Sequence, residues 1–71
     1  MHRINPAKLL NSKWTARDPV DGERHFTVVE LVRDEHDRII GCELEAVINR
    51  RRMDYDWRDL RDETRWSMGW K

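Results

Sequence analysis

The sequence predicts a mainly β fold: a small curled antiparallel meander, either an SH3-like barrel or an open sheet, with short helical turns at both termini. Three observations support this fold class. Apolar and polar residues alternate along several stretches, turn-forming residues separate these stretches, and the helical signals are confined to short segments near the two ends. At 71 residues the chain should be one domain, residues 1–71, with a thin core that draws much of its area from four tryptophans.

The N-terminal segment is predicted to form one or two helical turns. Asn5 is a favourable N-cap, and Pro6 occupies the first helical position, where a missing N–H costs nothing. The turns run through Leu10. Asn11 can end them, because Asn tolerates the left-handed conformation found at helix ends.

A first short strand is predicted from Ser12 onward. Trp14 and Ala16 fall on one face of it and polar residues on the other. Residues 18–22 include proline, aspartate and glycine, which are typical of loops. This loop should separate the first strand from the second.

The second strand, over residues 25–33, has an irregular pattern. Phe26 and Val28 share one face, whereas Leu31 falls on the other. Either both faces are partly buried, or a β-bulge near residues 29–30 resets the register so that all three side chains point inward. We favour the bulge, because it also curls a small sheet.

The third strand has the clearest alternation in the chain and follows a polar hairpin turn at residues 34–37. We expect this strand, residues 40–48, to be central in the sheet and its inward residues to be the most buried. These inward residues are Ile40, Cys42, Leu44, Ala46 and Ile48.

A tight turn at residues 49–51 leads to a fourth strand, in which Met53, Tyr55 and Trp57 alternate with polar residues. Sequential strands joined by short turns should form an antiparallel meander. Because alternation places Trp14 and Trp57 on inward faces, both are predicted to be structural.

The last part of the chain is predicted to form short helical turns. Asp56 can cap one turn through Leu60, and Asp62 can cap another through Trp66, which should also be structural. Gly69 then ends the regular structure.

Composition excludes several classes of protein. Net charge is zero, which argues against a generally basic nucleic-acid binder, although residues 1–17 carry four basic groups and no acid. No apolar run reaches the length of a membrane span, and the first residues lack the apolar stretch of a secretory signal. Cys42 is the single cysteine, which excludes an internal disulfide and is typical of reducing compartments. We expect a cytoplasmic protein without membrane association.

Six short blocks are spread over nearly the whole chain. They are Asn5-Pro6-x-Lys8-Leu9-Leu10, Ser12-Lys13-Trp14-Thr15-Ala16, His25-Phe26-x-Val28, Leu44-Glu45-Ala46-Val47, Trp57-x-x-Leu60 and Trp66-x-x-Gly69-Trp70. Together, in this order, they resemble a family of small tryptophan-rich bacterial proteins of unknown function. The resemblance implies a bacterial source and a domain that is a complete protein. It implies no activity, cofactor or catalytic residue.

Catalytic and metal-binding patterns do not stand out. Cys42 lies on the inward face of its strand, where burial raises the pKa of a thiol and makes it inert. His2, His25, His36 and Cys42 contain none of the close-spaced pairs used by structural zinc sites. Phosphate-binding glycine loops and glycine-flanked serines are not found. We therefore expect neither an enzyme nor a cofactor or metal site.

Five residues are candidates for a binding site: Lys13, His25, Arg51, Arg52 and Trp70. His25 begins a strand and belongs to the pattern that resembles the family. The arginine turn has the basic and aromatic neighbours used in nucleic-acid recognition, but interleaved acids favour ordinary ion pairs. Trp70 follows the last regular structure, and it is either a lid over the thin core or an anchor for a partner.

The function predicted from these features is a non-enzymatic binding or accessory module, with a protein partner favoured, because small domains often bind peptides in aromatic-lined grooves. The alternative is an RNA- or DNA-binding β domain. It would use the turn formed by Arg50, Arg51 and Arg52 together with the C-terminal arginines and tryptophans.

Overall fold

The computed structural model describes the whole chain, residues 1–71, as a five-stranded antiparallel sheet with two short 3₁₀ turns. This confirms the predicted mainly β fold with short helical turns. The strands are β1 (Lys13–Val20), β2 (Glu23–Arg33), β3 (Ile39–Ala46), β4 (Arg52–Tyr55) and β5 (Trp66–Met68), and the turns are η1 (Pro6–Lys8) and η2 (Trp57–Arg61).

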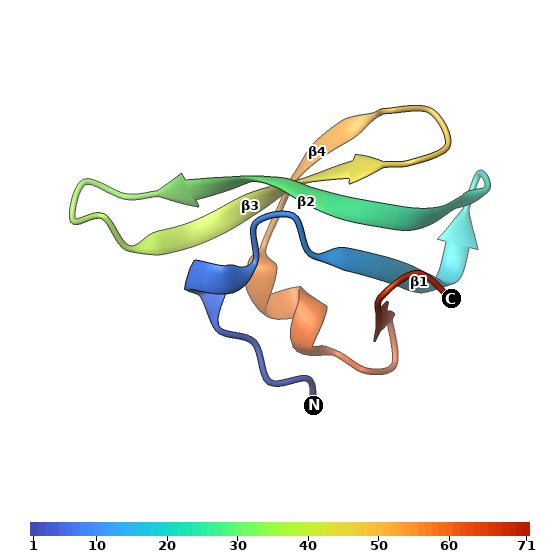
Figure 1. Cartoon of the computed structure of the whole chain (residues 1–71), viewed down its shortest axis with the longest axis horizontal. Helices are drawn as coiled ribbons and strands as arrows, with labels where there is room; N and C mark the ends of the chain where they lie inside the picture. The colour runs from blue at the N-terminus through green and yellow to red at the C-terminus, as the bar shows by residue number, and fades with distance from the viewer.

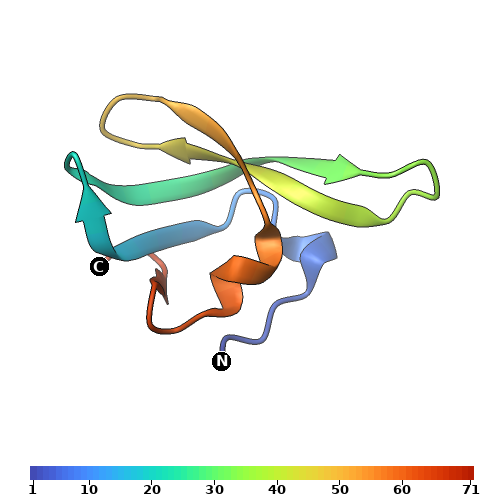
Figure 2. The same cartoon turned by 180° about the vertical axis from the view of Figure 1, so that it is seen from behind.

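The first four strands form a meander, and β5 returns to the far edge beside β1. The order across the sheet is β4-β3-β2-β1-β5, and every neighbouring pair is antiparallel. η1 and η2 lie on the same side of the sheet (Figure 1), as the view from behind also shows (Figure 2). Because the edge strands β4 and β5 do not pair, the sheet is open. The open-sheet alternative is confirmed, and no closed SH3-like barrel forms.

The core lies between the sheet and the segments that contain η1 and η2. Trp14 and Trp66 are 1% and 6% exposed, which confirms that both are structural, while Trp57 is partly buried and packs against the core. The nine buried apolar residues are Leu9, Trp14, Phe26, Val28, Cys42, Leu44, Ala46, Leu60 and Trp66.

Several local predictions are confirmed. The Asn5 side chain caps η1 by accepting a hydrogen bond from the backbone N–H of Ala7 at 3.1 Å. Asn11 adopts a left-handed φ of 69° after that turn. The β2–β3 register shifts between Val28 and Glu30, as expected for the predicted bulge.

The first strand is longer than predicted. β1 extends to Val20, so only Asp21 and Gly22 form the turn, with φ values of 54° and 77°. A two-residue turn with both φ angles positive matches the twist of a β-hairpin, and Asp-Gly is a favoured pair for it. Pro19 is tolerated in the strand because the β1–β2 register is irregular between Thr15 and Val20.

The third strand is correctly placed but is not central, because β2 occupies the middle of the sheet. Cys42, Leu44 and Ala46 are fully buried as predicted. Ile40 and Ile48 are 49% and 69% exposed, so both were wrongly assigned to the core. Ile48 lies in the turn after β3. Ile40 lies at the start of β3, beside the β2–β3 turn, where the sheet extends beyond the core.

Two tryptophans lie on elements other than those predicted. Trp57 begins η2 instead of ending the fourth strand, because Asp56 caps that turn by accepting from the N–H of Arg58 at 3.0 Å. Asp62 forms the predicted turn through bonds to Thr64, but Trp66 then begins β5. The fifth strand was missed because three residues show too little alternation.

Candidate functional site

One face of the sheet is left open to solvent, and we call it the outer face. Trp14 and Phe26 point into the core, so the alternate residues of β1 and β2 point outward. The register aligns Lys13 with Thr27, Thr27 with Glu45, and Glu45 with Arg52. These four side chains therefore form one row across the outer face.

The C-terminal residues turn onto the outer face over β1. After β5, Gly69 adopts a φ of 79°, which an L side chain rarely reaches, and its N–H donates to the Lys13 carbonyl oxygen at 2.8 Å. The Thr15 hydroxyl donates to the Gly69 carbonyl oxygen at 2.7 Å and accepts from the Lys71 N–H at 2.9 Å. Thr15 is 3% exposed as a result, and it pins the end of the chain.

Trp70 is thereby held against β1 and β2. Its indole Nε1–H donates to the Phe26 carbonyl oxygen at 3.1 Å, and the Lys13 Nζ lies 5.3 Å from the ring centroid. The His25 ring lies 6.0 Å from the Trp70 ring, and its Nε2 hydrogen-bonds to the Lys71 carbonyl oxygen at 3.0 Å. Trp70 itself remains 45% exposed. We call Lys13, His25 and Trp70 together the Trp70 surface.

Arg51 is paired with a carboxylate from a distant strand. Its Nε donates to the Glu23 Oε2 at 2.7 Å, and its Nη2 contacts the other Glu23 oxygen. Asn49 donates to the same carboxylate at 3.0 Å. These hydrogen bonds, that of Arg51 above all, lower the pKa of Glu23 from 4.5 to about 2.

The neighbouring arginines are paired within the β3–β4 hairpin. Arg52 contacts Glu45 at 3.0 Å and Glu43 at 3.4 Å, and Arg50 contacts Glu45 at 3.8 Å. Arg50, Arg51 and Arg52 therefore all have acidic partners. Their sequence also predicted this outcome, through the acids interleaved with the arginines.

The five candidate residues thus separate into two groups. Lys13, His25 and Trp70 come together on one surface. Arg51 and Arg52 lie with Arg50 on the β3–β4 hairpin, which we call the arginine hairpin, and their charges are neutralised there. The structure thus brings three of the five candidate residues together and places the other two elsewhere.

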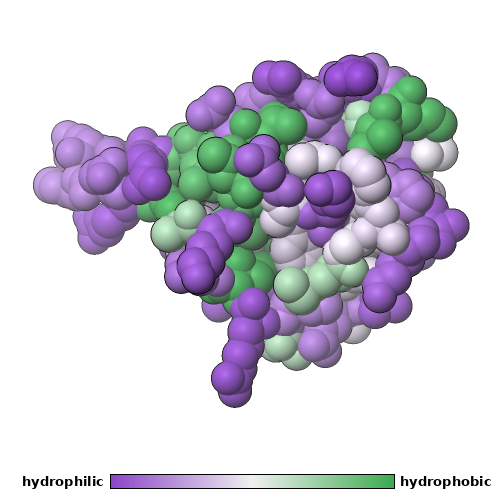
Figure 3. All heavy atoms as spheres, in the orientation of Figure 1, coloured by the Kyte–Doolittle hydropathy of each residue, from purple (hydrophilic) through white to green (hydrophobic).

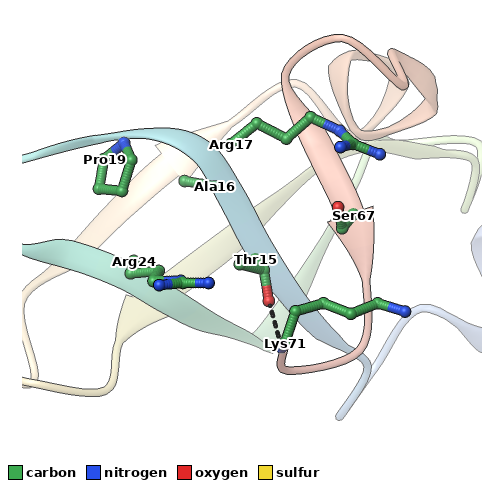
Figure 4. Close-up of a pocket in the computed structure, with 7 residues that line it drawn as sticks. All are labelled: Thr15, Ala16, Arg17, Pro19, Arg24, Ser67 and Lys71. Atoms are coloured by element: carbon green, nitrogen blue, oxygen red, sulfur yellow. Dashed lines mark hydrogen bonds between the residues drawn. The ribbon is translucent and has the colours of Figure 1, made fainter.

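Sequence reasoning missed three cations that lie next to the Trp70 surface. Arg17, Arg24 and Lys71 line an open cleft of about 550 Å³ between β1, β2 and the C-terminal residues (Figure 4). Arg17 and Arg24 lie on consecutive strands, whereas Lys71 comes from the far end of the chain. The one sequence signal was the excess of basic residues in positions 1–17.

The remaining reactive groups are structural. Cys42 is fully buried, and burial raises the pKa of its thiol to about 11, as expected of a packing cysteine. Burial, followed by a hydrogen bond to Asp59, raises the pKa of Tyr55 to about 12, and the Tyr55 hydroxyl accepts from the Trp66 indole at 3.1 Å. No group of three or more His, Cys, Asp or Glu side chains is placed to hold a metal ion.

Away from this site the surface is mixed: apolar patches lie among hydrophilic ones (Figure 3), and the exposed apolar side chains include Ile40 and Ile48. The tip of the β2–β3 hairpin projects from the body of the molecule and is hydrophilic throughout (Figure 3). Asp34 organises it by accepting from the N–H groups of His36 and Arg38 and pairing with the Arg38 guanidinium at 3.3 Å. The molecule contains no helix with the length and apolar character needed to cross a lipid bilayer.

Fold and site together define a small β protein with an open sheet and a surface aromatic cluster. Its sequence matches the tryptophan-rich protein family DUF2389, a family of unknown function, over residues 12–71, and the chain belongs to that family. This confirms the resemblance seen in the sequence for every block except the first, residues 5–10, which precedes the matched region. Comparison with curated proteins and with solved structures found no match.

Proposed function

We propose that this chain is a non-enzymatic binding module of the cytoplasm that holds an acidic segment of a protein partner on the Trp70 surface. The observation that carries the proposal is the state of Trp70. The only polar atom of its side chain, Nε1, is already hydrogen-bonded within the protein, yet Trp70 is 45% exposed. The bonded N–H fixes the ring, so the exposed part is a rigid apolar anchor, the kind of residue that dominates many protein interfaces.

The charges around Trp70 favour an acidic partner. Lys13 lies against the indole and forms no ion pair. Lys71, which follows Trp70, also lacks an acidic partner and lines the adjoining cleft with Arg17. Free cations beside an apolar anchor attract a segment of opposite charge and set its orientation.

A protein segment fits this surface better than a nucleic acid strand does. Proteins that bind single strands stack successive bases on several aromatic rings and follow the backbone with a continuous basic groove. Trp14 and Trp66 are buried, and Trp57 packs against the core under Arg58 and Arg61, so Trp70 is the one tryptophan on this surface. Across the sheet from Lys13, the outer-face row continues into Glu45 and Arg52, which neutralise each other.

The non-enzymatic part of the proposal rests on the same inventory of side chains. The single thiol is buried with a raised pKa, and His25 makes its contacts with the C-terminal residues. An activated nucleophile needs a base within hydrogen-bond reach. Two hydroxyls of this protein do bond to carboxylates, but Thr64 with Asp62 closes a turn, and Tyr55 with Asp59 belongs to the partly buried network that also holds the Trp66 indole.

The proposal is tested by capture with matched variants. The tagged protein is cross-linked in native cytoplasm, and the partner is then purified and titrated against wild type, Trp70→Ala, Lys13→Ala and Arg52→Ala. We expect Trp70→Ala to weaken binding by about a hundredfold, as a hot-spot residue would. Lys13→Ala should weaken it less, and Arg52→Ala should leave it unchanged.

Nuclease treatment separates the alternative. Capture that survives nuclease and depends on Trp70 supports the proposal. Capture that disappears with nuclease, falls steeply with salt and depends on Arg52 would instead establish the nucleic-acid function of the arginine hairpin.

A further inference from the structure

The cleft beside the Trp70 surface concentrates unpaired positive charge. Arg17 comes from β1, Arg24 from β2, and Lys71 from the end of the chain. None of the three forms an ion pair or a side-chain hydrogen bond, whereas Arg50, Arg51 and Arg52 all have acidic partners. Like charges on neighbouring strands oppose folding, so folding alone gives no reason for this cluster.

The nearby acids form no ion pair with the cations of the cleft. Asp18, which follows Arg17, lines a different cleft with Thr64 and Arg65. The Glu63 carboxylate is paired with the N-terminal ammonium group at 2.7 Å, which is the main cause of its lowered pKa, and Arg17 contributes least to that shift. Glu23, which precedes Arg24, is held by Arg51. Arg17, Arg24 and Lys71 therefore have no side-chain ion-pair partner.

The backbone of the cleft is held in place by hydrogen bonds. The Thr15 hydroxyl bridges the Gly69 carbonyl oxygen and the Lys71 N–H, and His25 hydrogen-bonds to the Lys71 carbonyl oxygen. Arg17 and Lys71 extend in the same direction on either side of Ser67, and the Arg24 side chain points toward Thr15 in this view (Figure 4). The Ser67 hydroxyl makes no hydrogen bond within the protein and lines the same cleft.

We propose that this cleft binds a phosphate group. Two guanidinium groups, an ammonium group and a free hydroxyl supply the donors that a phosphate dianion needs, and arginine matches its oxygens in pairs. A carboxylate has two oxygens and would use one arginine, which leaves the other donors of the cleft unused. The volume of about 550 Å³ leaves room for the group that carries the phosphate.

The site goes beyond the proposed function, because it requires no protein partner. Its phosphate could be free or carried on a phosphorylated side chain, and both sources present the same oxygens to Arg17, Arg24 and Lys71. The adjacency of the cleft to Trp70 would allow a phosphorylated segment to use both sites at once.

The test is a titration of the purified protein followed by NMR of the arginine Nε–H groups and the Ser67 amide. Inorganic phosphate should produce saturable shifts at Arg17, Arg24 and Ser67, with a Kd on the order of 1 mM. Sodium chloride at matched ionic strength should not. Arg24→Gln should weaken binding by about tenfold. Arg38→Gln, which removes an arginine that is paired at the distant hairpin tip, should leave the Kd unchanged.

Two further experiments identify the source of the phosphate and test the role of the hydrogen bonds that Thr15 makes to the C-terminal residues. A phosphoserine peptide that binds more tightly than inorganic phosphate assigns the site to a phosphorylated side chain, and the reverse order assigns it to free phosphate. Thr15→Val should weaken both ligands while core amide resonances stay in place, because Lys71 is released. The proposal is overturned if phosphate causes no saturable shift, or if Arg24→Gln binds it as well as wild type does. Neither result would affect capture through Trp70.

Discussion

The arginine hairpin and the cleft beside the Trp70 surface contain similar cationic side chains, but those of the hairpin are paired with acids and those of the cleft are not. The hairpin places three arginines in a row in the sequence, and each meets a carboxylate: Arg51 meets Glu23, and the other two meet Glu43 and Glu45. The cleft gathers Arg17, Arg24 and Lys71 from three parts of the chain, and none has an acidic partner. Density of charge in a sequence is therefore a poor guide to free charge on a surface, because register decides which strand neighbours face each other.

Both regions stand on one sheet, so a change to the shared core should weaken them together. Leu44 is fully buried on β3, and Leu44→Ala should lower the free energy of unfolding by about 2 to 5 kcal/mol. Denaturant unfolding followed by tryptophan fluorescence measures this. A Leu44→Ala protein with an unchanged midpoint would show that the core assignment is wrong.

Removal of the carboxylate that neutralises the hairpin should expose the difference between the regions. Glu23 is 7% exposed and is bonded to Arg51 and Asn49, so Glu23→Gln should lower Tm clearly. Arg24→Gln is the matched control from the cleft. It removes a neighbouring charge without a partner and should leave Tm nearly unchanged. Equal losses in the two variants would contradict the contrast drawn between paired and unpaired cations.

Acid should act on the hairpin in the same way. The folded-state pKa of Glu23 is about 2, below the ordinary value of 4.5, so its contribution is fully present above pH 4.5 and is lost as pH falls toward 2. Tm measured from pH 6 to pH 2 should therefore fall more steeply in wild type than in Glu23→Gln. Parallel curves for the two proteins would mean that the Glu23–Arg51 pair does not form in solution.

Trp70 should contribute less to stability than a core tryptophan, because it is 45% exposed and lies on the outer face. We expect Trp70→Ala to cost about 2 kcal/mol and Trp66→Ala about 3 to 5 kcal/mol. Chemical denaturation of both variants gives the comparison. Equal costs would favour the view of Trp70 as a lid for the core over the view of it as an anchor.

The smallest effect is expected at the exposed edge of the hairpin. Arg52 pairs with Glu43 and Glu45 at the surface, where ion pairs contribute little. Arg52→Ala should therefore leave Tm within error of wild type while Glu23→Gln does not. A large loss would indicate that the surface network, rather than the Glu23–Arg51 pair, holds the hairpin.

The candidate site was predictable in part. His25 was singled out by its place at the start of a strand and in the family pattern, and Trp70 by its position after the last regular structure, and with Lys13 they come together. Arg51 and Arg52 were singled out by composition, and they have acidic partners. The partner of Arg51, Glu23, is 28 residues away in the chain, so no local pattern relates the two.

The sequence by itself determined the features that depend on neighbouring residues. Alternation identified four strands, Asn5 and Asp56 capped their turns, and the broken alternation of β2 located a bulge. Only the tertiary structure decided where β5 pairs and which cations remain free. Both depend on residues distant in sequence: Ala16 pairs with Trp66 across 50 positions, and that pairing carries Lys71 to its place beside Arg17 and Arg24. Local propensity acts over a few residues, whereas such pairings are selected by the burial of the whole core.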